Sequence, residues 1–216
     1  MTTALDRTDF RAVLGRERLL PVVVVDAARD APPLAEALRD GGLGLVEVTL
    51  RTPAALDAID RIREAPGMRV GAGTVLDASQ VAAAYAAGAG FIVSPGLERD
   101  VVEAARALGL PVVPGIATAT ELMAARRLGL DLVKFFPAAA LGGVDALRGL
   151  ASLAPTIGFV PTGGVTELNL ADYLGVPGVV ACGGTWIAPR DLIAAGRFGE
   201  IARRARVARD IAHTTA

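Results

Sequence analysis

One residue of this sequence is of a type that its surroundings do not predict. Lys134, the only lysine, interrupts the apolar run at 132–136, while the other 21 of the 22 basic residues are arginines. In an apolar strand the ammonium is either buried or breaks the pattern that buries its neighbours. A desolvated lysine can lose its proton and act as a nucleophilic amine, which a guanidinium cannot. Lys134 is therefore a candidate Schiff-base former, and the alternative is a buried ion pair that stabilises the fold.

A second polar set lies in and just after the apolar run at 45–50. With the two-residue alternation of a strand, Glu47, Thr49 and Arg51 share one face, and the apolar residues between them share the other. Because the helix-facing side must be apolar, we expect the polar set to point to the inside of the fold. Glu47 and Arg51 either neutralise each other or, together with Lys134, leave one cation that a bound anion or a neutral lysine explains.

Two glycine pairs follow the last two predicted strands, as Pro161-Thr-Gly-Gly164 and Cys182-Gly-Gly-Thr185. Paired glycines allow backbone amides to converge on an anion, and a helix that begins there adds a favourable dipole. In α/β barrels the loops after strands seven and eight frequently bind phosphate. The alternative is a pair of tight turns with no ligand.

Composition narrows the classes of function. The net charge of -1 and the sequence pI of about 5.9 provide no basic field for nucleic acid or an anionic membrane. The single cysteine, Cys182, rules out an intramolecular disulfide and is expected to pack in the core. The single histidine, His213, argues against His-based acid/base chemistry and against a His-ligated metal site. We expect no metal and no cofactor. With no signal-peptide core and no membrane-spanning run, we expect a cytoplasmic protein.

The elements that must position these residues repeat along the chain. Eight β-rich runs recur with helical spacing between them, at 20–25, 45–50, 70–73, 91–93, 112–113, 132–136, 158–160 and 178–182. This repeat predicts an α/β fold, a single eight-stranded parallel β/α (TIM) barrel with an extra N-terminal helix at 8–15, and a single domain over residues 1–216. A doubly wound open sheet is the second choice, because no dinucleotide fingerprint is present. In such a barrel the site lies at the carboxyl ends of the strands.

Six motifs occur in one order along the chain, over about 20–195, and the set is far more specific than any one of them. They are Glu47-Val-Thr-Leu-Arg51-Thr, Gly71-Ala-Gly-Thr74-Val-Leu, Ser94-Pro95-Gly96, Lys134-Phe-Phe-Pro137-Ala, Pro161-Thr162-Gly-Gly164 and Gly183-Gly-Thr185-Trp. The set resembles the 2-keto-3-deoxy-6-phosphogluconate (KDPG) and 4-hydroxy-2-oxoglutarate aldolase family. The resemblance implies a class I, metal-independent aldolase, a carbon-carbon lyase, that cleaves KDPG to pyruvate and glyceraldehyde 3-phosphate in the Entner-Doudoroff pathway of carbohydrate metabolism, usually as a homotrimer.

The resemblance also implies a role for each matching residue. Lys134 would form the Schiff base and Glu47 would be the general acid and base. The residues implied in substrate binding are Arg51 and Thr74 for the carboxylate, Pro95, Phe136 and Thr162 for the pocket lining, and Gly163, Gly164, Gly184 and Thr185 for the phosphate. One position departs from the family pattern: Ala139 stands where relatives commonly have an acid, which bears on substrate preference or local packing.

Two other functions stay open at this point. The chain can act on a related substrate, either 4-hydroxy-2-oxoglutarate, giving pyruvate and glyoxylate, or the phosphogalactonate analogue. Alternatively it is a non-catalytic barrel that binds a phosphorylated metabolite, in which case Lys134 forms no imine. The partner we expect is a phosphorylated 2-keto acid, with no nucleic acid and no membrane.

Overall fold

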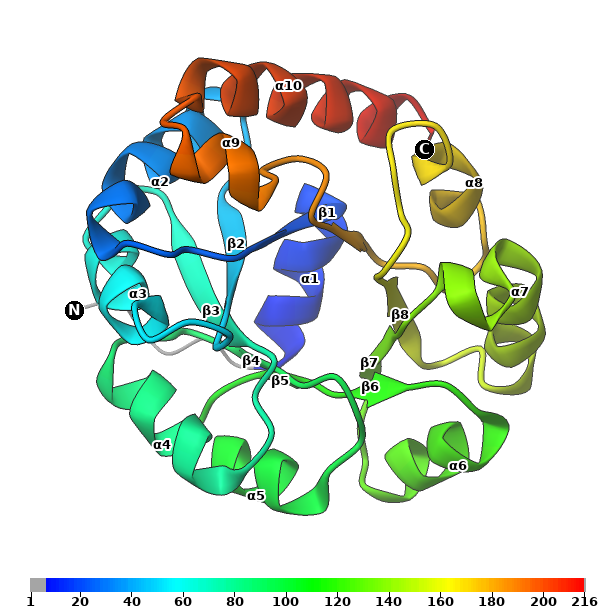
Figure 1. The fold of residues 1–216 in the computed structure, drawn as a ribbon. Helices are drawn as coiled ribbons and strands as arrows, with labels where there is room; N and C mark the ends of the chain where they lie inside the picture. Colours follow the sequence, from blue (N-terminus) through cyan, green and yellow to red (C-terminus); the bar gives the residue numbers. More distant parts are fainter. Residues whose placement is uncertain (1–6, 216) are drawn as a thin grey trace.

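The computed structural model describes residues 7–215, with strands inside and helices outside (Figure 1). The strands are β1 (Leu19–Val23), β2 (Leu45–Thr49), β3 (Arg69–Gly73), β4 (Ile92–Val93), β5 (Val112–Val113), β6 (Gly115–Ile116), β7 (Leu132–Phe135), β8 (Gly158–Pro161) and β9 (Cys182–Gly184). The α-helices are α1 (Arg7–Glu17), α2 (Ala31–Asp40), α3 (Ala55–Arg63), α4 (Ala78–Ala86), α5 (Arg99–Ala107), α6 (Ala119–Arg127), α7 (Gly143–Leu153), α8 (Leu170–Leu174), α9 (Arg190–Ala194) and α10 (Phe198–Thr214). Two 3-10 turns, η1 (Ala28–Asp30) and η2 (Ala139–Leu141), complete these elements. No helix within residues 7–215 is long and apolar enough to cross a bilayer.

The closed eight-stranded barrel predicted from the repeat is wrong, although the α/β class is confirmed. The strands form two parallel sheets, one of six strands in the order β5-β4-β3-β2-β1-β9 and one of three strands in the order β6-β7-β8. Pairing between the β8 and β9 regions is reduced to two isolated bridges, Phe159 of β8 with Val179 before β9 and Thr162 after β8 with Gly183 of β9. The last strand also begins later than predicted, at Cys182. The predicted N-terminal helix is present as α1.

A proline lies at each place where the sheets are interrupted. Pro114 separates β5, which pairs with β4, from β6, which pairs with β7. Pro161 ends β8, between the two bridged residues Phe159 and Thr162. Proline has no backbone N–H to donate and therefore weakens a continuous ladder. Apolar periodicity predicts the strands that surround the centre, but it contains no information about these missing hydrogen bonds.

An apolar cluster joins both sheets to α1, which Figure 1 shows in the middle of the molecule. Its buried members are Phe10, Val13, Leu14, Leu20, Leu45, Phe91, Val93, Val113, Leu132, Val160 and Ala181. The rings of Phe10 and Phe91 lie 4.7 Å apart between centroids. Arg11 Nη1 donates to the carbonyls of Asp131 and Thr156, just before β7 and β8, so α1 lies at the amino ends of these strands. This end of the interior is therefore filled with apolar side chains.

A capping box begins α6 and makes its stability depend on pH. Glu121 accepts hydrogen bonds from Ala117 N, Thr118 N and Thr118 Oγ1, all at 2.8 Å, and Thr118 Oγ1 accepts from Glu121 N. Burial opposes ionisation, but these hydrogen bonds outweigh it, and the pKa of Glu121 lies below its ordinary value of 4.5. A lowered carboxylate pKa contributes stability above the unfolded-state pKa, and this contribution is lost as the pH falls through the folded-state pKa.

We therefore expect Glu121→Gln to lower the free energy of unfolding by about 1 kcal/mol at pH 7. The difference between the two proteins should shrink as the pH falls below about 4.5, because the wild-type carboxylate becomes protonated there. Urea denaturation at a series of pH values measures both effects. A difference that is independent of pH between 7 and 3 would contradict this account of the cap.

Candidate active site

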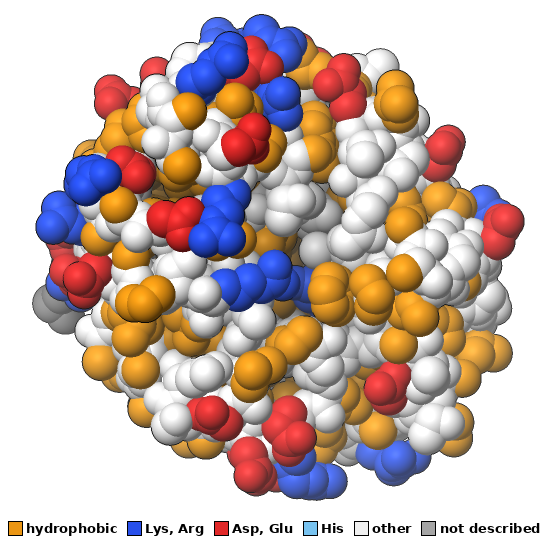
Figure 2. Space-filling view, viewed as in Figure 1, with side chains coloured by type: hydrophobic (Ala, Val, Ile, Leu, Met, Phe, Trp, Pro, Cys, Tyr) orange, Lys and Arg blue, Asp and Glu red, His pale blue; other side chains and the backbone are white. Residues whose placement is uncertain are grey.

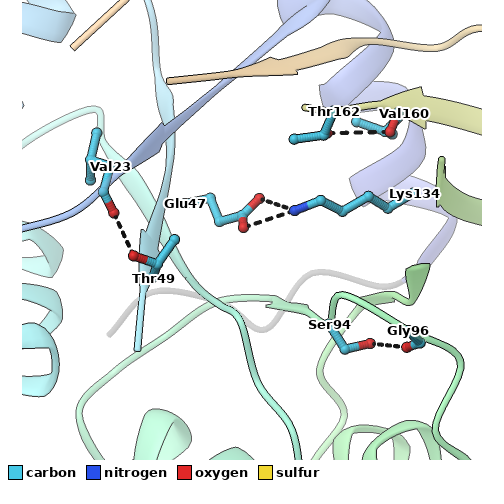
Figure 3. A network of polar contacts seen from close by, with 8 residues as sticks. All are labelled: Val23, Glu47, Thr49, Ser94, Gly96, Lys134, Val160 and Thr162. Atoms are coloured by element: carbon cyan, nitrogen blue, oxygen red, sulfur yellow. Dashed lines mark hydrogen bonds and ion pairs between the residues drawn. The ribbon is translucent and has the colours of Figure 1, made fainter. Parts of the chain in front are cut away.

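Lys134 and Glu47 meet inside the fold as a buried ion pair. Lys134 Nζ donates to Glu47 Oε1 at 3.1 Å and to Oε2 at 3.4 Å (Figure 3). The lysine side chain is 7% exposed and the glutamate side chain 1%. Lys134 is on β7 and Glu47 on β2, so the pair joins the two sheets. The ion pair considered for Lys134 is thus present, and it also places a proton acceptor beside the amine.

Strand alternation explains why both side chains point inward. Leu45 and Leu132 belong to the apolar cluster above α1, and Glu47 and Lys134 follow them by two residues. Val46 and Val133, one residue out of phase, belong to the outer core that packs against the helices. The pair is therefore one residue layer above an apolar floor that keeps water from its lower side. This layer is the one nearer to the carboxyl ends of the strands.

Glycines on β3 create the space that Glu47 occupies. A Cβ at Gly73 would overlap Glu47 Oε1, and one at Gly71 would overlap the Phe91 ring. The structure fills both spaces with side chains of the protein, and the role of Gly73 as a support for Glu47 was missed.

We expect Gly73→Ala to displace the Glu47 carboxylate. The kcat of a reaction that the pair catalyses should then fall by about 10²-fold, the order of loss that a misplacement of about 1 Å produces. Overpacking should also lower the free energy of unfolding by about 1–3 kcal/mol. Steady-state kinetics and urea denaturation measure the two effects. Gly149→Ala is the matched control, because a Cβ at Gly149 of α7 meets nothing within 4 Å. A Gly73→Ala enzyme with wild-type kcat would show that this contact does not position Glu47.

Arg51 lies beyond the end of β2, so the alternation of the strand does not decide where it points. β2 ends at Thr49, whose buried hydroxyl donates to Val23 O at 3.0 Å (Figure 3). Arg51 is exposed in the turn that follows, and its backbone N–H donates a hydrogen bond to Thr49 O. Within residues 7–215 its guanidinium makes no hydrogen bond or ion pair, so the predicted alternative of a Glu47 to Arg51 pair is excluded. Arg51 is thus a cation at the carboxyl end of β2 that is free to meet an anion.

Thr74 has a strained backbone at the carboxyl end of β3. Its φ of 58° lies in the left-handed region, where a β-branched residue is a rare outlier. Gly73 O accepts from Leu50 N, while Val75 N donates to Val93 O. Because Gly73 faces Glu47, regular alternation would turn Thr74 to the outside, and the left-handed turn breaks that alternation. Strain of this kind is typical of functional sites.

Phe136 lies beside the pair, and Pro95 lies in the turn after β4. Lys134 Nζ is 5.4 Å from the centroid of the Phe136 ring, within the range of a cation–π contact. Pro95 lines a pocket of about 260 Å³ that extends from Val75 to Glu98, and neither Lys134 nor Glu47 belongs to its lining. Ser94 Oγ donates to Gly96 O at 2.8 Å and holds this turn (Figure 3). Phe136 is thus within contact range of the lysine, whereas the role of Pro95 stays a prediction.

The loop after β8 contains Thr162, Gly163 and Gly164. Thr162 is buried, its Oγ1 donates to Val160 O, and it lies directly against Gly183 (Figure 3). Both glycines have positive φ, 92° and 81°. The predicted helix dipole is not available, because α8 starts only at Leu170 and has five residues. Any anion at this loop must therefore be bound by the amides of the loop itself.

The position that departs from the family pattern lies against this loop. Ala139 Cβ occupies the space that a Cβ at Gly164 would take, and Ala139 N donates to Gly163 O at 2.9 Å. A side chain at position 139 therefore bears directly on the conformation and charge of the loop.

The second glycine pair forms β9 and the turn after it. Gly184 is buried and Thr185 is exposed. A Cβ at Gly184 would be 2.7 Å from Cδ1 of Trp186, whose carbonyl accepts from Arg204 Nη1 of α10. Figure 2 shows a hollow near the centre of this face, with basic side chains at its edge.

The remaining candidates play no part in the site. Cys182 is buried in the core, as expected, and burial raises the pKa of its thiol. Among residues 7–215 no three His, Cys, Asp or Glu side chains gather as ligands for a metal ion.

The chain is similar to known proteins over most of its length. A sequence model of the family described as KDPG and KHG aldolase matches residues 10–204. The 2-dehydro-3-deoxy-phosphogluconate aldolase of Treponema pallidum is 48% identical over 195 residues, which are 90% of this chain and 92% of the relative. The crystal structure of the KDPG aldolase of Zymomonas mobilis ZM4 with 3-phosphoglycerate is 43% identical and covers 94% of this chain and 95% of its own, with a TM-score of 0.88.

A second similar structure bears on the chemistry. It is the KDPG aldolase of Legionella pneumophila with pyruvate captured as a covalent carbinolamine intermediate, 40% identical, with a TM-score of 0.87 and coverage of 91% of this chain and 96% of that one. The family match and this identity over most of the sequence lead to one conclusion. The chain belongs to the KDPG and KHG aldolase family.

Proposed function

We propose that this protein is a class I aldolase that cleaves KDPG to pyruvate and glyceraldehyde 3-phosphate. The observation that carries the proposal is the buried pair of Lys134 and Glu47, at 3.1 Å, in a member of this family. A pyruvate adduct captured in the Legionella relative supports covalent chemistry. A non-catalytic barrel has no need of a desolvated amine beside a proton acceptor.

The reaction begins with proton transfer within the pair. Glu47 takes a proton from the ammonium of Lys134, and the free amine attacks the C2 ketone of the substrate to give a carbinolamine. The returned proton helps hydroxide leave as water, and the product is an iminium between Nζ and C2. The positive iminium nitrogen is the electron sink for the next step.

Cleavage of the C3–C4 bond uses the same carboxylate. Glu47 removes the proton of the C4 hydroxyl, the C4–O bond becomes the carbonyl of glyceraldehyde 3-phosphate, and the C3–C4 electron pair moves to the iminium to give an enamine. The proton then returns to C3 and forms the methyl group of pyruvate. Water adds to the iminium and releases pyruvate from Lys134.

The substrate-binding roles follow from position and chemistry. Arg51 has an unpaired guanidinium suited to a carboxylate, and Thr74 offers a hydroxyl on a strained turn. We propose these two for the carboxylate of the pyruvyl half. The pocket lining we propose is Pro95, Phe136 and Thr162, and the phosphate contacts are Gly163, Gly164, Gly184 and Thr185. The phosphoglycerate in the Zymomonas structure supports a phosphate site in this family.

Five further expectations extend this proposal. We propose that residues 1–216 form a single aldolase domain, which the continuous family match over 10–204 supports. We also propose a cytoplasmic homotrimer that acts in the Entner-Doudoroff pathway. Small, alanine-rich helices such as α4 permit close contact between subunits. Cleavage of 4-hydroxy-2-oxoglutarate is a second candidate activity, because the family's description includes it and the same pair can act on it.

Borohydride reduction in the presence of pyruvate tests the proposal. The chain has one lysine, so a reduced pyruvyl adduct located by peptide mapping on Lys134 identifies the Schiff base. Release of pyruvate from KDPG and from 4-hydroxy-2-oxoglutarate, measured in parallel, decides between the two substrates. A folded protein that forms no adduct and cleaves neither compound would overturn the aldolase and favour a non-catalytic binding protein.

A further inference from the structure

In the loop after β8, the backbone carbonyls of Thr162, Gly163 and Gly164 each accept a hydrogen bond from a residue outside these three. Ala138 N donates to Thr162 O at 2.8 Å, and Ala139 N donates to Gly163 O at 2.9 Å. The third carbonyl, that of Gly164, accepts from a side chain, Asn169 Nδ2, at 3.0 Å. Two of these bonds come from the backbone that follows Lys134, and only the third depends on the identity of a side chain.

Because the peptide bond is planar, each of these hydrogen bonds also fixes the direction of the N–H group of the next residue. In a trans peptide the N–H points opposite to the C=O of the preceding residue. The bond on Gly163 O therefore directs the Gly164 N–H away from Ala139, and the bond on Gly164 O directs the Val165 N–H away from Asn169. Neither N–H meets an acceptor within residues 7–215. Val165 is buried and Gly164 is exposed, so these two donors are available to water or to a ligand.

Asn169 is itself fixed at both ends of its amide. Its Oδ1 accepts from Thr166 N at 2.8 Å while its Nδ2 donates to Gly164 O. One bond uses the amide oxygen as acceptor and the other uses an amide N–H as donor, and this network sets the orientation of the amide. An aspartate in its place keeps the bond from Thr166 and loses the bond to Gly164.

We propose that Asn169 is a positioning residue for phosphate: by holding the carbonyl of Gly164, it aims the Val165 amide at the substrate phosphate beside the Gly164 amide. This inference rests on the proposed function. It adds a side chain that touches no substrate atom but sets the direction of a backbone amide that does. The signal in the sequence is an asparagine five residues after the glycine pair, ahead of a short helix.

The test compares Asn169→Asp and Asn169→Ala with Leu168→Asp. Leu168 is 94% exposed, so Leu168→Asp adds the same negative charge one residue away without removing a hydrogen bond. Two activities are measured: KDPG cleavage, and exchange of the pyruvate methyl protons in D₂O followed by NMR, which needs the imine and enamine but no phosphate. Thermal unfolding checks that each variant is folded, and Asn169→Asp keeps the Thr166 bond as a safeguard.

Both Asn169 variants are expected to raise KM for KDPG about tenfold, with kcat and pyruvate exchange within about twofold of wild type. Leu168→Asp should leave KM within about twofold. The inference is overturned if both Asn169 variants keep the wild-type KM, or if they lower pyruvate exchange as much as cleavage, which indicates a general structural role. If the wild-type protein neither exchanges pyruvate protons nor cleaves KDPG, the proposed function itself fails and the role of Asn169 fails with it.

Discussion

Lys134→Arg is expected to lower kcat for KDPG cleavage by about 10⁴-fold or more, the order of loss seen when a covalent nucleophile is removed. Arginine keeps a cation beside Glu47, but its guanidinium stays protonated and forms no imine. Cleavage kinetics measure the loss of rate, and borohydride trapping with pyruvate should give no adduct at position 134. A variant that still cleaves KDPG at more than about a hundredth of the wild-type rate would show that catalysis does not pass through the amine.

A neutral variant separates catalysis from stability. Lys134→Met removes one partner of a buried ion pair and leaves Glu47, 1% exposed, without its cation. We expect a loss of about 3–5 kcal/mol in the free energy of unfolding, measured by urea denaturation. Combining it with Glu47→Gln should recover part of this loss, because no unpaired charge remains. Equal stabilities of the single and double variants would contradict the cost assigned to the lone carboxylate.

Residue type and strand alternation were enough to predict that Lys134 and Glu47 point to the inside of the fold. A single lysine in an apolar strand, in a chain that otherwise uses arginine, predicted a buried amine, and the two-residue alternation of β2 turned Glu47 toward it. Both inferences rest on interactions within one strand, which sequence patterns report directly. The distance between the two residues does not follow from either pattern, because β2 and β7 belong to different sheets.

Predictions failed where strand ends and strand pairing decide the outcome. Alternation was carried from Glu47 to Arg51, but β2 ends at Thr49 and Arg51 lies in an exposed turn. The closed barrel was inferred from eight apolar runs, whereas closure depends on hydrogen bonds that Pro114 and Pro161 cannot donate. A proline inside or at the end of such a run therefore predicts an interruption of the sheet.

Apolar periodicity did not indicate two residues whose contacts depend on the fold. The small size of Gly73 matters because Glu47 from the neighbouring strand occupies its space. The contact of Asn169 lies within one loop, where its amide reaches Gly164 five residues earlier in the chain. Periodicity reports which residues face the core, and it contains no information about either contact.

Glu47→Gln is expected to lower kcat for KDPG cleavage by about 10²–10⁴-fold, the usual contribution of a general acid and base. Glutamine has nearly the same shape, so it fits beside Gly73 and its Oε1 still accepts from Lys134 Nζ. What it loses is the ability to take a proton from the C4 hydroxyl and to return one to C3. Pyruvate methyl exchange in D₂O should therefore fall together with cleavage, because both require this proton transfer.

Thr49→Val is the matched control on the same strand and face. It removes the buried hydrogen bond to Val23 O and leaves the ion pair intact, so we expect a loss of about 1 kcal/mol in stability with kcat within a few-fold of wild type. A Glu47→Gln enzyme that is folded and loses no more activity than Thr49→Val would remove Glu47 from the chemistry. If cleavage falls but pyruvate exchange does not, the carboxylate acts at the C4 hydroxyl alone, and another group protonates C3.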